Sequence, residues 1–159
     1  MTINKGSCDL ETTCDLLDKL TLTQLHLIED KMRSELNLES CINNGSFHLA
    51  KSRYIMGQNS VSKEKLPTEN TTEFSASVKT VGKQENSITQ LEIVDQKDDT
   101  LQINPVHWFG VLVPQNLHKA KELFSNAINH VVEAVNIQLQ ILDNVKKIET
   151  LKAYKKSLV

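Results

Sequence analysis

The chain has 159 residues and a formal net charge of −2, with 18 lysines and arginines against 20 acidic residues. A nucleic-acid-binding protein normally carries a marked basic excess, so this balance argues against nucleic acid as a partner. One Trp, two Tyr, four Phe and five Gly are present, and such a composition suits extended helical packing better than a dense sheet core.

A long amphipathic helix is predicted for residues 8–57. Its apolar residues recur at steps of mostly three or four, in the series Leu10, Cys14, Leu17, Thr21, Leu25, Ile28, Met32, Leu36 and Ile42. Further leucines widen this stripe beyond a two-stranded seam, which implies contact with more than one neighbour. The turn-forming run Asn43-Asn44-Gly45-Ser46 predicts a kink or brief break, and Gly57 suits a left-handed helix cap.

Residues 58–103 change character, because Ser, Thr, Asn, Gln, Lys and Glu dominate and large apolar side chains are sparse. Such a composition cannot offset its own ordering entropy. We therefore expect a disordered polar linker. Residues 88–94 are the exception. Their apolar side chains are compatible with a transient strand or a short docking motif, as the alternative to disorder.

Residues 104–114, which we name the clasp, read N-P-V-H-W-F-G-V-L-V-P and hold the only Trp. The flanking prolines prevent an ordinary helix interior. Two interpretations stay open. The clasp folds back over the helices as a plug, or it exposes an aromatic anchor for a partner, since Trp is enriched in interface hot spots.

A second long amphipathic helix is predicted for residues 115–156, where apolar residues again recur at steps of three and four. Two rods of similar length, joined by a flexible segment, can bury their stripes by folding into an antiparallel hairpin. The predicted fold class is therefore all-α, an antiparallel coiled-coil hairpin with a disordered central linker.

The sequence predicts no catalytic, cofactor-binding or metal site. It contains no phosphate-binding G-x-x-x-x-G-K-[ST] loop and no H-E-x-x-H motif. His26 and Asp30 stand one turn apart, as do His118 and Glu122, but structural zinc normally takes four ligands. We also expect no membrane-spanning helix, which needs about 20 apolar residues, and no signal peptide, because acidic residues interrupt the N-terminal region.

Five lysines gather in the last turns of the second predicted helix. They complement the negative end of the helix dipole, or they contact an anionic membrane surface. The residues are Lys146, Lys147, Lys152, Lys155 and Lys156.

Two stretches resemble a known family. Residues 47–57 read F-H-L-A-K-S-R-Y-I-M-G, and the clasp is followed by a helix opening L-H-K-A-K-E-L-F. In their order and separation, the two motifs resemble those of the coiled-coil assembly factors of the vacuolar-type proton ATPase. Tandem aromatics and a glycine between prolines have no general helical explanation, which makes the second motif the more specific one.

The resemblance implies a non-enzymatic assembly chaperone for the membrane sector of that ATPase, supporting lysosomal acidification. It implies a location on the cytosolic face of the endoplasmic reticulum membrane, with the intermediate compartment toward the Golgi as a further location. The implied partners are a small membrane-spanning assembly factor of the endoplasmic reticulum and the membrane-sector subunits. Membrane association would then be peripheral and would pass through the partner.

In an antiparallel hairpin both motifs lie at the loop end, so we predict a protein-interaction surface there. Its predicted members are Arg53, Tyr54, Gly57, Trp108, Phe109, Gly110, Val111, Leu112 and Pro114. A competing interpretation is a generic coiled-coil adaptor or tether that acts as a homodimer and is unrelated to proton pumping.

Overall fold

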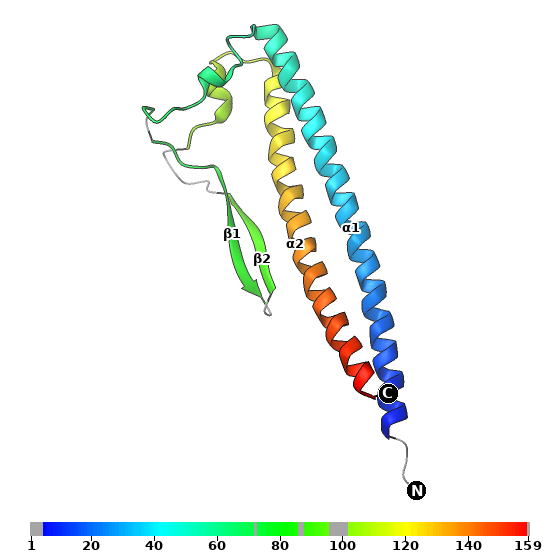
Figure 1. The fold of residues 1–159 in the computed structure, drawn as a ribbon. Coiled ribbons are helices and arrows are strands. Elements are labelled where there is room, and N and C mark those ends of the chain that lie inside the picture. Colours follow the sequence, from blue (N-terminus) through cyan, green and yellow to red (C-terminus); the bar gives the residue numbers. More distant parts are fainter. Residues whose placement is uncertain (1–4, 72, 86–87, 96–101, 159) are drawn as a thin grey trace.

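Two long helices dominate the computed structural model, which describes residues 5–71, 73–85, 88–95 and 102–158. Helix α1 spans Lys5–Met56 and helix α2 spans Gln115–Leu158. The two helices lie side by side and run in opposite directions (Figure 1). Between them in the chain come the short 3-10 helices η1 (Lys63–Lys65) and η2 (Pro105–Phe109). The mostly helical architecture that the sequence predicts is confirmed.

The expectation of an all-α fold is wrong, because part of the polar segment 58–103 forms a small sheet. Strands β1 (Val78–Glu85) and β2 (Ile88–Asp95) pair antiparallel, with Glu85 opposite Ile88. Both strands are rich in Val, Ile and Thr, which favour extended backbone. The strand alternative for residues 88–94 is therefore confirmed, whereas residues 72, 86–87 and 96–101 of the predicted linker lie outside the described residues.

A side-chain amide of α2 binds the backbone of β2. The Asn136 Nδ2 donates to the Leu91 carbonyl at 2.9 Å, and the Leu91 N–H donates to the Asn136 Oδ1 at 2.8 Å. Leu91 lies opposite Gly82 of β1, and Asn136 satisfies the backbone groups that Leu91 does not share with that strand. A two-stranded hairpin is marginal alone, so the sheet depends on its packing against α2. The composition of the segment does not reveal this packing, and it therefore predicts disorder.

On the α1 side, the seam contains several small and polar side chains, and only part of the predicted apolar stripe, such as Leu17, is buried there. Thr13, Ser34 and Ser52 of α1 are buried, whereas Leu25 and Leu36 are 59% and 64% exposed. The stripe was expected to face the second helix, but α1 is apolar around much of its circumference and α2 covers only one sector. Much of the predicted stripe therefore faces outward.

Hydrogen bonds across the seam fix the antiparallel register. Asn144 is 5% exposed, and its Nδ2 donates to the Leu20 carbonyl at 3.0 Å and to the Gln24 Oε1 at 2.8 Å. A buried amide with a single set of partners disfavours slipped alignments. Other bonds follow along the seam, from Lys31 Nζ to Gln138 Oε1, from Ser34 Oγ to the His130 carbonyl, and between His48 Nδ1 and Asn116 Oδ1.

Helix α1 runs without interruption through residues 43–46, so the predicted break there is absent. Gly45 is buried, and a Cβ at this position would lie 3.0 Å from the Phe124 ring of α2. A helix-interior glycine costs about 1 kcal/mol relative to alanine. Here the glycine lets an aromatic ring approach the backbone, and it does not make a turn.

The close contact at Gly45 predicts a measurable coupling with Phe124. In a Phe124→Leu variant, Gly45→Ala should raise the free energy of unfolding by about 0.5–1 kcal/mol through helix propensity. In the native chain the added Cβ meets the Phe124 ring, so the same substitution should stabilise less or destabilise. Urea unfolding followed by circular dichroism should give a coupling energy of at least about 0.5 kcal/mol. Ser46→Ala, at the adjacent exposed position, is the control, and additive effects for Gly45→Ala would contradict the packing role.

The Asn136 contact predicts that one side chain controls the attachment of the sheet. In Asn136→Ala the Leu91 amide loses its acceptor, so hydrogen exchange of residues 88–95 should become faster. The unfolding free energy of the helix pair should change by less than about 1 kcal/mol. Asn129→Ala, on the same helix, is the matched control, and unchanged exchange in Asn136→Ala would show that other contacts hold the sheet.

Candidate functional site

The structure brings the two sequence motifs together at the loop end of the helix pair (Figure 1). Helix α1 ends at Met56, and Gly57 follows with a φ of 89°, the left-handed cap that the sequence predicts. A hollow of about 630 Å³ is lined by Arg53 of α1 and by Phe109 of η2. Residues more than fifty positions apart in the chain therefore share one surface.

The first half of the clasp is a capped turn that points inward. Asn104 Oδ1 accepts the Val106 N–H at 3.3 Å, and Pro105 begins the turn, where its missing N–H is tolerated. Val106 is 3% exposed. Gly110 then ends the turn with a φ of 136°, and its N–H donates to the His107 carbonyl at 3.3 Å.

Trp108 packs within the molecule. Its ring meets the Phe74 ring edge-on, with centroids 5.5 Å apart and planes at 70°, a favourable aromatic arrangement. Trp108 and Phe109 are both half-buried, and both line a hollow between the clasp and α2. The geometry of these two rings corresponds to the plug interpretation.

The second half of the clasp points outward. Val111 is 91% exposed and Leu112 is 93% exposed, and Tyr54 of α1 is likewise 91% exposed. The Pro114 carbonyl accepts the Leu117 N–H at 2.9 Å, so the exposed pair is held between two defined turns. Large apolar side chains this exposed on short, constrained backbone are typical of interaction sites.

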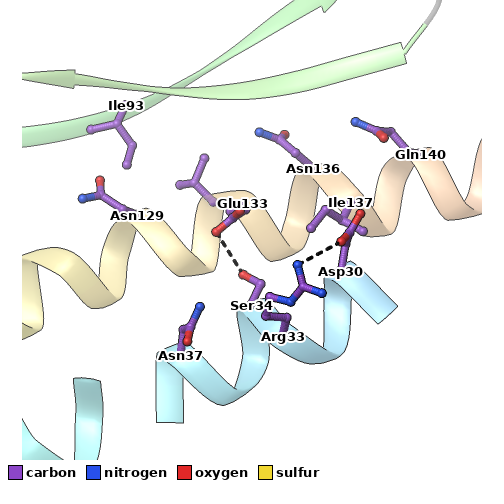
Figure 2. A pocket seen from close by; sticks show the side chains of 11 residues that line it. Asp30, Arg33, Ser34, Asn37, Ile93, Asn129, Glu133, Asn136, Ile137 and Gln140 are labelled. Atoms are coloured by element: carbon purple, nitrogen blue, oxygen red, sulfur yellow. Dashed lines mark hydrogen bonds and ion pairs between the residues drawn. The ribbon is translucent and has the colours of Figure 1, made fainter. Parts of the chain in front are cut away.

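A separate polar groove lies between α1, α2 and β2 (Figure 2). Arg33 is already paired, to Glu29 at 2.9 Å and to Asp30 at 3.8 Å, and Ser34 Oγ donates to Glu133 Oε2 at 3.4 Å. The remaining polar lining is mainly amides, namely Asn37, Asn129, Asn136 and Gln140. Paired charges and amides offer neither an activated nucleophile nor a positioned base.

Two other kinds of site are absent from the described residues. No group of three or more His, Cys, Asp or Glu side chains in that part of the chain could hold a metal ion. No described helix is long and apolar enough to cross a membrane.

Several residues that shape this end of the molecule were not predicted from the sequence. Phe74 supports Trp108, and it is the one Phe in the polar segment 58–103, which could have marked it. Ser52 is fully buried, and its Oγ donates to the His48 carbonyl at 2.9 Å. Nothing in the sequence distinguishes Ser52 from the exposed serines around it.

Comparison with known proteins adds to this geometry. No family model matches the chain. The chain is similar to Vacuolar ATPase assembly protein VMA22 of Danio rerio, with 29% identity over 175 aligned residues that cover 82% of this chain and 84% of the relative. This similarity agrees with the family that the two motifs indicate. Over most of its length, the chain is thus similar to a vacuolar ATPase assembly protein.

Proposed function

We propose that the protein is a non-enzymatic assembly factor for the membrane sector of the vacuolar-type proton ATPase. The observation that carries the proposal is the match to an assembly protein over 82% of the chain. The two motifs, which the fold places at one end, support it. The protein would act at the cytosolic face of the endoplasmic reticulum membrane and would thereby support acidification of lysosomes.

The proposed mechanism assigns two surfaces to binding. At the loop end, Tyr54, Val111 and Leu112 present exposed apolar groups, while Trp108 and Phe109 hold the clasp in place from within. Rigid backbone under an exposed apolar pair lowers the entropy lost on binding. This surface would hold the small membrane-spanning assembly factor or a subunit of the client.

A second surface runs along the outer face of α1. Leu25, Met32 and Leu36 are each at least 59% exposed and recur at helical spacing. Such a stripe suits an amphipathic helix of a partner. Together the two surfaces would let one rod contact a membrane-anchored partner and a partly assembled client at the same time.

Affinity purification from cells tests the proposal. We expect membrane-sector subunits and one small membrane protein to dominate the captured set. Light scattering with and without the co-expressed membrane protein separates the competing interpretation, because a generic tether would form a stable homodimer alone. Absence of proton-pump subunits from the captured set would contradict the proposed assembly role.

The division of the clasp predicts two different mutant phenotypes. Val111→Asp combined with Leu112→Asp should weaken capture of the partner at least about tenfold, because an exposed apolar contact is replaced by charge. Its unfolding free energy should stay within about 0.5 kcal/mol of the native value. Trp108→Ala should instead lower that free energy by about 1–3 kcal/mol, because it removes a half-buried ring.

The control is Val81→Asp, which places the same charge on a partly exposed valine of β1, outside the clasp. Capture measured by pull-down and stability measured by thermal unfolding should separate the variants. Intact capture by the Val111→Asp/Leu112→Asp variant would show that the exposed pair is not an interaction site.

A further inference from the structure

The hollow between the clasp and α2, which Trp108 and Phe109 line, has the dimensions of a small-molecule site. Its volume is about 480 Å³, within the range of about 300–1,000 Å³ that is usual for ligand pockets. Four segments form its walls, namely the end of α1, residues 74–78, η2 and the first turns of α2. The assembly role does not account for this space.

The walls of the hollow are mainly aliphatic and aromatic. Phe74, Val106, Trp108, Phe109, Leu117 and Phe124 all line it. An apolar chain placed there would lose its contact with water and gain contact with several rings. The lining therefore favours a ligand whose body is a hydrocarbon.

One positive charge stands among these apolar groups. Lys121 is the only charged residue in the described part of the chain that lines the hollow, and it is exposed at the side of α2. No ion pair joins Lys121 to a carboxylate in the described part of the chain. A ligand with one negative group beside its apolar body would complement this arrangement.

We propose that this hollow, the clasp pocket, binds an amphiphile with a hydrocarbon chain and a single anionic head group, either a carboxylate or a phosphate. The chain would lie against Trp108 and Phe124, and the head group would meet the Lys121 ammonium at the rim. The proposal is independent of the assembly role.

An extended peptide is a poorer occupant of the same space. A buried peptide brings an N–H and a carbonyl with each residue, and each needs a hydrogen-bond partner. Among the described residues, the polar side-chain groups of the lining are three serine hydroxyls, the Trp108 indole N–H and the Lys121 ammonium. A hydrocarbon chain makes no such demand.

Trp108 reports on occupancy, because it is the only Trp in the chain. Its fluorescence is followed while the full-length protein is titrated with dodecanoate, dodecyl phosphate, dodecanol or dodecylammonium, each below its micelle-forming concentration. We expect a saturable change with both anions, weaker binding of dodecanol and the weakest binding of dodecylammonium. The tighter of the two anions tells whether the head group resembles that of a fatty acid or that of a phospholipid.

Two lysine variants test the head-group contact. Lys121→Glu should weaken the binding of the preferred anion about tenfold or more and leave dodecanol binding unchanged. Lys119→Glu is the matched control, since Lys119 is exposed on the same helix but does not line the pocket. Ser125→Phe should fill the mouth of the pocket and abolish the response to every probe, with thermal unfolding confirming that the variant is folded.

Three results would overturn the proposal. Equal binding of all four probes would indicate unspecific partition of hydrocarbon. Equal effects of Lys119→Glu and Lys121→Glu would indicate general surface charge. A third result is that no anionic probe changes the Trp108 fluorescence, although a partner protein does. This result would exclude an amphiphile as the occupant.

Discussion

The close, polar seam between α1 and α2 is the contact on which the rest of the structure depends. Gly45 lets the Phe124 ring approach the α1 backbone, and the buried Asn144 amide bonds to Leu20 and Gln24 of the opposite helix. Neither contact survives a shift of one helix past the other. Apolar packing alone tolerates several alignments, whereas these two contacts select one.

A fixed register decides what meets at the loop end. Once α1 and α2 are aligned, the last turn of α1 lies beside the clasp, and the two motifs form one surface (Figure 1). Trp108 and Phe109 then pack inward while Val111 and Leu112 remain exposed. The plug and anchor interpretations of the clasp are therefore not exclusive, because each describes a different half of the same segment.

The seam also explains why so much apolar surface faces outward. Small and polar residues of α1 face α2, so leucines such as Leu25 and Leu36 stay exposed. Exposed apolar stripes are a liability for a protein that acts alone. They are useful to a protein that must bind other chains, which is the role proposed from its relative. The arrangement thus leaves apolar surface available for partner binding and does not bury it in a larger hydrophobic core of the chain itself.

The sequence by itself determined the two long helices, the Gly57 cap and the two motifs that indicate the family, because helical periodicity, caps and proline positions act locally. It also favoured one end of the molecule for binding, through the antiparallel arrangement. Only the tertiary structure decided the seam, since Ser34 and Asn144 resemble exposed polar residues until another helix covers them. The sheet and the unbroken helix at Gly45 were decided in the same way. Asn136 and Phe124, distant in sequence, supply the contacts that override the local preference for disorder and for a turn.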